Sequence, residues 1–146
     1  MKIGVFSSPG GHLTEIMRLI EAFDGDELFF VLHTGPRHVQ GYTEYQIKVS
    51  PWTLRVIIGL TWRSWRILRK ERPEALISTG AQICIPAFWL AKFMGIRTIF
   101  IEDLCRIDQP TRTGRAVYPV VDRFLVQHPE LLAHYGPKAR YEGGVL

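Results

Sequence analysis

The stretch Lys2-Ile3-Gly4-Val5-Phe6-Ser7-Ser8-Pro9-Gly10-Gly11-His12 decides the fold of this chain. Its first five residues form an apolar run that predicts a strand, and the glycines that follow predict a tight turn. From His12 to Phe23 apolar side chains recur at helical spacing, which predicts an amphipathic helix. The polar face of that helix is expected to hold Thr14, Glu15, Arg18 and Glu21.

The same alternation of strand, turn and helix continues along the chain. Further strands are expected at Leu28–Leu32, Ala75–Ser78, Thr98–Ile101 and Phe124–Val126. Further helices are expected at Trp52–Glu71, Gln82–Phe93, Thr111–Tyr118 and Pro129–Tyr135. Residues 33–50 are weakly patterned, with Tyr45–Val49 as a candidate strand. Alternating short apolar strands and amphipathic helices predict an α/β fold, a Rossmann-like doubly wound parallel sheet, in a single domain over residues 1–146.

Composition sets the class of protein. The chain has 146 residues, of which 47% are hydrophobic, enough for one core. Its net charge of +4 gives a mild preference for anionic partners. Cys84 and Cys105 lie in or beside apolar runs and are expected to be buried free thiols. No run approaches the ~20 apolar residues that span a bilayer, so any membrane contact is expected at the surface.

The glycine turn after the first strand is a candidate anion site. Glycines let the backbone approach a ligand closely, and a helix N-terminus offers free N–H groups to a phosphate. The alternative is a tight turn that binds nothing. The turn lacks GxGxxG, the second strand ends in His33-Thr34-Gly35 without a ribose-binding acid, and no Walker GK[ST] ending is present.

Two other strand ends carry polar residues. Glu102 and Asp103 follow a strand at the edge where doubly wound folds bind ligands, and Arg106 comes shortly after them. A carboxylate there can deprotonate an acceptor hydroxyl, and Arg106 can hold a phosphate. The alternative is an acidic cap on the loop, paired with Arg106. The Ser78–Ala81 turn lies at the same edge.

The helix expected at Trp52–Glu71 has a basic face. At ~100° per residue, its arginines and Lys70 gather on one side together with Trp52 and Trp62. This composition favours an anionic bilayer surface. A nucleic-acid contact is a second interpretation, for which the chain shows no recognised motif. A plain solvated face is the third.

Several segments in this order resemble one family. They are Ser7–Arg18, Arg72–Gly80, Ile99–Arg106, Gly114-Arg115, Asp122–Gln127 and Tyr141–Gly144. Together they resemble the membrane-anchor subunit of the two-subunit N-acetylglucosaminyltransferase that extends dolichyl-diphosphate-N-acetylglucosamine. They also resemble bacterial relatives in capsule and exopolysaccharide synthesis, which add a second sugar to an undecaprenyl-diphosphate-linked sugar.

The resemblance implies the amino-terminal half of a GT-B glycosyltransferase. A partner subunit is then expected to bind the donor nucleotide sugar, and this chain to hold a polyprenyl-diphosphate-linked acceptor without metal or cofactor. Either Glu102 or His12 is the expected base. The residues expected to hold the acceptor diphosphate are Ser7, Ser8, Gly10, Gly11, Thr79, Gly80 and Arg106. Membrane contact is expected at Trp52, Arg55, Trp62, Arg63, Arg66 and Lys70, and partner contact at Tyr141, Gly143, Gly144, Val145 and Leu146.

Two departures from the family pattern qualify this expectation. The eukaryotic anchor subunit has an amino-terminal transmembrane helix, whereas this sequence shows none, which favours a prokaryotic protein bound peripherally at the cytoplasmic face. Asp103 stands where the family more often has a small residue such as serine. Two other functions remain open, a non-catalytic membrane recruiter and a stand-alone nucleotide-binding enzyme. Nucleic acid is not an expected partner.

Overall fold

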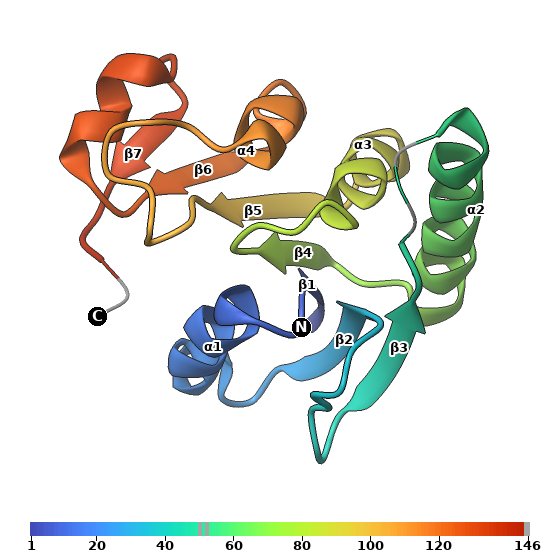
Figure 1. The fold of residues 1–146 in the computed structure, drawn as a ribbon. Helices are drawn as coiled ribbons and strands as arrows, with labels where there is room; N and C mark the ends of the chain where they lie inside the picture. The colour runs from blue at the N-terminus through green and yellow to red at the C-terminus, as the bar shows by residue number, and fades with distance from the viewer. Residues whose placement is uncertain (50, 52, 145–146) are drawn as a thin grey trace.

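The fold is built on one parallel sheet, shown in Figure 1. The computed structural model describes residues 1–49, 51 and 53–144. The strands are β1 Lys2–Ser7, β2 Glu27–His33, β3 Thr43–Ile47, β4 Ala75–Ser78, β5 Arg97–Ile101, β6 Arg123–Val126 and β7 Ala139–Tyr141. They lie in the order β3-β2-β1-β4-β5-β6-β7, and every pair is parallel. This is the doubly wound order of a Rossmann-like sheet and confirms the expected fold class.

Helices cover both faces of the sheet. They are α1 Gly11–Arg18, α2 Leu54–Glu71, α3 Cys84–Met94 and α4 Arg112–Val117, with 3-10 turns at Ile20–Phe23 and Pro129–His134. Figure 1 shows α1 on one face and α2, α3 and α4 on the other. Phe29 and Leu76 belong to the core beneath α2 and α3, whereas Phe30 and Ile77 belong to the core beneath α1. Strands covered on both faces are largely apolar, as the central strands β1, β2 and β4 are.

Some expected boundaries differ from those observed. The first helix was expected to reach Phe23, but it ends at Arg18, where Leu19 N–H donates to Ile16 O at 2.9 Å and begins a 3-10 turn. The last expected helix, from Pro129, is also a 3-10 turn. Cys84 is buried as expected, but Cys105 is exposed, because it lies on the polar loop after β5. Trp52 lies outside the described residues.

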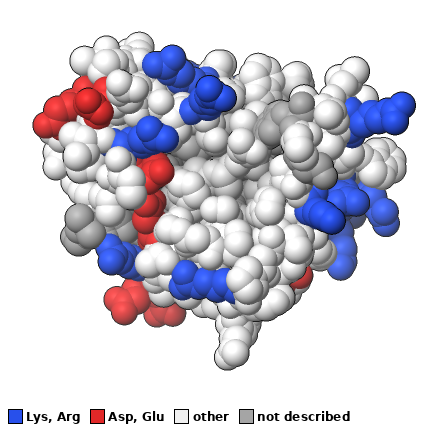
Figure 2. Space-filling view, in the orientation of Figure 1, with Lys and Arg blue, Asp and Glu red and all other residues white. Residues whose placement is uncertain are grey.

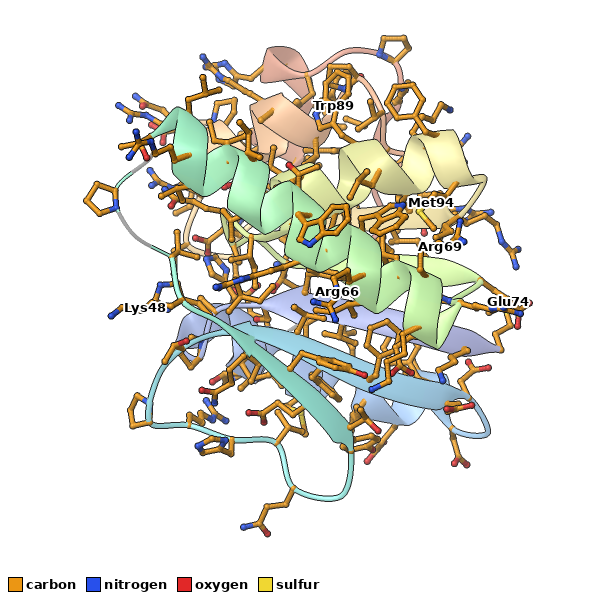
Figure 3. The ribbon with its side chains drawn as sticks, turned by 90° about the vertical axis from the view of Figure 1, so that its right-hand side faces the viewer. Lys48, Arg66, Arg69, Glu74, Trp89 and Met94 are labelled. Atoms are coloured by element: carbon orange, nitrogen blue, oxygen red, sulfur yellow. The ribbon has the colours of Figure 1, made fainter. Side chains whose placement is uncertain are left out.

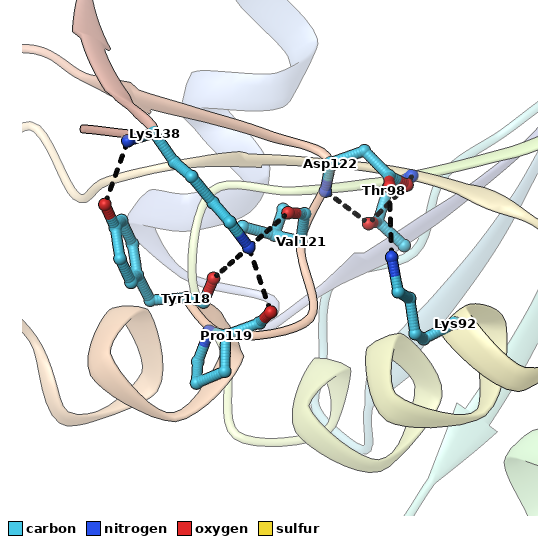
Figure 4. A network of polar contacts seen from close by, with 7 residues as sticks. All are labelled: Lys92, Thr98, Tyr118, Pro119, Val121, Asp122 and Lys138. Carbon is cyan, nitrogen blue, oxygen red and sulfur yellow. Dashed lines mark hydrogen bonds and ion pairs between the residues drawn. The ribbon is translucent and has the colours of Figure 1, made fainter. Parts of the chain in front are cut away.

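A polar network braces the sheet at the start of β5 (Figure 4). The carboxylate of Asp122 accepts hydrogen bonds from Thr98 N at 2.8 Å and Thr98 Oγ1 at 3.1 Å. Nearby, Lys138 Nζ donates to the carbonyl oxygens of Pro119 at 2.9 Å and Tyr118 at 3.3 Å. These hydrogen bonds tie the segment before β7 to the end of α4. They help to hold this end of the sheet, where the strands are short.

Gly4 provides a test of how tightly the sheet packs. A Cβ at this position would lie 2.6 Å from Phe29 Cζ and 2.8 Å from Leu76 Cδ2. We expect Gly4→Ala to lower the free energy of unfolding by about 1–3 kcal/mol, because the added methyl group overpacks a filled core. Gly59, inside α2, has open space at its Cβ, so Gly59→Ala is expected to raise stability by up to about 1 kcal/mol. Urea unfolding followed by circular dichroism measures both, and equal stability of Gly4→Ala and wild type would contradict the packing.

Candidate acceptor site

The polar loops expected to form a site meet at the carboxyl edge of the sheet. β1, β4, β5 and β6 all end there, and the residues that follow them contribute the side chains described below. In the orientation of Figure 1, acidic side chains on this face are bordered by Lys and Arg (Figure 2). This edge of a doubly wound sheet is where ligands bind in such folds.

The N-terminus of α1 is open toward this edge. Gly10 is the N-cap residue, no side chain caps the helix, and its first turn contains no acid. Gly10 and Gly11 are both exposed, and a Cβ at either would meet nothing within 4 Å. The first N–H groups of a helix need partners from outside it. Open space beside uncapped N–H groups is the local geometry that accepts an anion.

His12 is fixed in place by the loop that follows β4. Thr79 Oγ1 donates to the backbone carbonyl of His12 at 2.9 Å. The His12 ring lies over Gly80, where a Cβ would be 2.7 Å from the ring Cε1. Gly80 also has a φ of 124°, a conformation that favours glycine. His12 Nδ1 is buried and has no hydrogen-bond partner in the described part of the chain.

Glu15 is the unexpected member of the site. Its side chain was expected on the polar outer face of the first helix, but the residue is only 7% exposed. It accepts hydrogen bonds from Leu104 N at 3.3 Å and Gln127 Nε2 at 3.5 Å, so the loop after β5 covers it. Burial and, after it, the charge of Asp103 raise the pKa of Glu15 to about 7.

His12, Glu15 and Asp103 form one cluster. One ligand atom from each lies within 4.8 Å of those of the other two. Three such groups can share a proton or hold a cation. The raised pKa of Glu15 favours the shared proton, since burial disfavours the charged carboxylate and the protonated form relieves the repulsion with Asp103. The hydrogen bonds from Leu104 N and Gln127 Nε2 act in the opposite direction and are outweighed.

Glu102 is the common acceptor of a hydrogen-bond network in the loop that follows β5. It is fully buried, and its carboxylate accepts hydrogen bonds from Asp103 N at 3.0 Å, Thr111 N at 3.3 Å and Thr111 Oγ1 at 2.7 Å. The Tyr135 hydroxyl also donates to it. Burial and this contact with Glu102 raise the pKa of Tyr135, so its hydroxyl remains a donor. The sequence offered an acidic cap on this loop, paired with Arg106, as the alternative to a base. Glu102 does cap the loop, but the side chains that donate to it are those of Thr111 and Tyr135.

The other expected site residues are distributed around this edge. Ser7 is buried at the end of β1, where its hydroxyl donates to the carbonyl of Ser8 at 3.1 Å. Arg106 is exposed on the loop after β5. Tyr141, Gly143 and Gly144 are exposed, whereas Val145 and Leu146 lie outside the described residues.

The residues expected to contact a membrane lie away from the site, on α2. Arg55, Trp62, Arg63, Arg66 and Lys70 are all exposed there. The exposed face also includes apolar residues of the first half of the helix, since its buried side chains begin only at Leu60. Among the described residues, no helix is both long enough and apolar enough to cross a bilayer.

Sequence reasoning missed Glu15, Thr111 and Tyr135. Glu15 lies three residues after His12, a spacing that places two side chains on one face of a helix, and this was the available signal. Thr111 caps α4 by accepting from Gly114 N at 2.9 Å, which a Thr before a helix can indicate. No local signal pointed to Tyr135, which reaches Glu102 from 33 residues away.

The fold is that of one Rossmann-like half of a GT-B-type structure. A crystal structure of MurG from Acinetobacter baumannii superposes with a TM-score of 0.79 at 14% identity, over 98% of this chain and 46% of that one. A UDP-GlcNAc 2-epimerase from Neisseria meningitidis, solved with UDP-GlcNAc bound, superposes with a TM-score of 0.74 at 13% identity. The match covers 99% of this chain and 47% of the epimerase. The chain thus spans slightly less than half the length of these structures.

Residues 46–145 match the family described as oligosaccharide biosynthesis protein Alg14 like, and the chain belongs to that family. The UDP-N-acetylglucosamine transferase subunit ALG14 of Homo sapiens is 27% identical, over 100% of this chain and 83% of the human protein. The subunit of the same name from Saccharomyces cerevisiae is 29% identical, over 98% of this chain and 76% of the yeast protein. These relatives are eukaryotic and give no support to the expected prokaryotic origin.

Glu15 predicts a specific dependence of stability on pH. Folding raises its pKa from 4.5 to about 7, so the folded chain holds a proton that the unfolded chain releases between these values. Below about pH 4.5, protonated Glu15 makes its full contribution to the free energy of unfolding. This contribution is lost as pH rises through about 7. We expect wild type to lose stability relative to Glu15→Gln across this window. Parallel curves from thermal unfolding of the two proteins would contradict the burial of Glu15.

The hydrogen bond from Tyr135 to Glu102 predicts a second effect. Tyr135→Phe keeps the ring but removes one donor from a buried carboxylate, and we expect a loss of about 1–3 kcal/mol in the free energy of unfolding. Gly114→Ala should perturb the same network, because a Cβ there would lie 2.5 Å from Glu102 Oε2. Tyr141→Phe, at an exposed tyrosine, is the matched control. Equal unfolding curves for Tyr135→Phe and Tyr141→Phe would show that the bond contributes nothing.

Proposed function

We propose that this chain is the acceptor-binding and membrane-associating subunit of a heteromeric glycosyltransferase. The complex transfers a sugar from a UDP-sugar to a hydroxyl of a polyprenyl-diphosphate-linked sugar, with residues 1–146 acting as one domain. The named relatives are UDP-N-acetylglucosamine transferase subunits, which makes N-acetylglucosamine the first donor sugar to test. The observation that carries the proposal is the open N-terminus of α1 beside a fixed His12.

The acceptor diphosphate binds at the α1 N-terminus. Free N–H groups at Gly11 and His12, the space beside Gly10 and the absence of acid in the first turn all suit a diphosphate. Ser7, Ser8, Thr79 and Gly80 shape the floor of the site. Arg106, exposed on the loop after β5, supplies a guanidinium to the phosphate oxygens.

His12 acts as the base and Glu102 as the positioning residue. The Glu102 carboxylate is fully buried and already accepts from Asp103, Thr111 and Tyr135, so a substrate hydroxyl would have to displace one of these donors. His12 instead lies at the open helix end. When its ring takes the hydroxyl proton, the neighbouring Asp103 carboxylate stabilises the imidazolium.

A separate subunit supplies the donor site. The named relatives are subunits of a UDP-N-acetylglucosamine transferase, which supports a partner subunit that binds the donor. Tyr141, Gly143 and Gly144, exposed at and after β7, together with Val145 and Leu146, are the proposed contact. The complex lies peripherally at the cytoplasmic face of the membrane, held there by the exposed arginines and Trp62 of α2, with Trp52 just before them.

The test is sugar transfer to a polyprenyl-diphosphate-linked acceptor, by this chain alone and with its co-expressed partner. We expect transfer only with the partner. His12→Ala should reduce turnover by about 10²–10⁴-fold, the usual contribution of a general base, while the complex still forms. His134→Ala, at an exposed histidine of the 3-10 turn Pro129–His134, is the matched control.

The other outcomes separate the competing functions. Full activity in both His12→Ala and Glu102→Gln would reduce this chain to a membrane recruiter. Loss of transfer in Glu102→Gln alone, in a complex that still forms and is as stable as wild type, would make Glu102 the base. Transfer by the isolated chain would exclude the two-subunit proposal.

A further inference from the structure

A basic hollow lies between α2 and β3, at the opposite end of the sheet order from β6 and β7. Its volume is about 530 Å³, and its cationic lining residues are Arg63, Arg66, Arg69 and Lys70. Tyr45, Gln46, Ile47, Trp65 and Ile67 complete the lining. β3 is the edge strand of the sheet, so no further strand covers this side. In Figure 3, Arg66 projects from α2 toward β3, with Lys48 beyond the end of that strand.

The positive charge of the hollow is not balanced by the protein. No carboxylate lines it, and in the described part of the chain none of the four cations forms an ion pair. The adjacent acid, Glu71, is bound by Lys2 Nζ at 2.7 Å and accepts from the Tyr45 hydroxyl. Four like charges on two turns of one helix repel one another, and an anion in the hollow would relieve that repulsion.

An aromatic stack connects the hollow with the outer surface of α2. Trp62 and Trp65 stack with ring centroids 4.8 Å apart, and the Arg69 guanidinium lies 5.5 Å from the Trp65 ring. Trp62 is 57% exposed, and Ile58, one turn before it, is 61% exposed. Tryptophan beside exposed apolar side chains and arginine is the composition of helices that lie in a bilayer interface.

We infer that the hollow between α2 and β3 binds the phosphate of an anionic lipid headgroup while Trp62 and Ile58 enter the bilayer interface. The inference rests on the membrane contact in the proposed function and gives it a specific ligand group. Arginine favours this ligand, because its planar guanidinium pairs with two phosphate oxygens at once. A lipid source is favoured over a free anion because the exposed tryptophan and isoleucine adjoin the cations.

The test is binding of the purified chain to vesicles, measured by flotation. The probes are phosphatidylcholine vesicles alone, with phosphatidylserine, and with phosphatidic acid at matched surface charge, since the phosphate of phosphatidic acid is unmasked. We expect the tightest binding to phosphatidic acid. The double variant Arg66→Gln/Lys70→Gln should bind those vesicles roughly 30-fold more weakly, because each cation near an anionic surface contributes about fivefold.

The matched control is Arg97→Gln/Arg123→Gln, which removes the same charge at the first residues of β5 and β6. Equal losses in the two double variants, or equal binding to phosphatidylserine and phosphatidic acid, would overturn the headgroup site in favour of diffuse attraction. Binding of inorganic phosphate without binding to any vesicle, or preferential binding of single-stranded RNA, would overturn the lipid as ligand. The assay uses no sugar acceptor, so failure of transfer and failure of vesicle binding are separate results.

Discussion

The buried carboxylate of Glu102 is the interaction on which the carboxyl edge of the sheet depends. A charge in a fully buried position is tolerated only when its oxygens are satisfied, and here the donors come from three segments. They are the residue after Glu102, the cap of α4 and the 3-10 turn before β7. One carboxylate thus fixes the loop 102–111, the start of α4 and the position of Tyr135. Gly114 is required because a side chain there would collide with the same oxygens.

With that loop fixed, the environment of α1 follows. The backbone N–H of Leu104 reaches Glu15, and Gln127 joins Glu15 to the backbone carbonyl of Glu102, donating to it at 2.8 Å. Asp103, adjacent to Glu102, is thereby held beside His12 and Glu15. The raised pKa of Glu15 is therefore a consequence of loop closure over α1. A change that loosens Glu102 should reach His12 through the backbone of residues 102–104.

Periodicity was sufficient to predict the central strands, because β1, β2 and β4 are buried on both faces and α1 and α2 each have a distinct apolar stripe. It assigned Glu15 to the solvent, since a helix pattern shows only which residues share a face and cannot show that a distant loop covers it. The long-range contact of Tyr135 with Glu102 has no local signature at all. Glu102 itself was found as a polar residue at a strand end, but the choice between base and cap required its four donors to be seen.

Charge is divided between two regions of the molecule, and the division suits a lipid-linked acceptor. The cluster at the carboxyl edge brings two acids beside His12. The hollow against β3 is lined by four cations, for which the described residues provide no ion pair, and by no acid. A negatively charged surface would be attracted to the second region and repelled by the acids of the first. A membrane held at α2 would therefore leave the α1 N-terminus free to receive a diphosphate. The positive groups at that end of the helix include the backbone N–H dipoles and the guanidinium of Arg37, which donates to Thr14 Oγ1 at 2.8 Å.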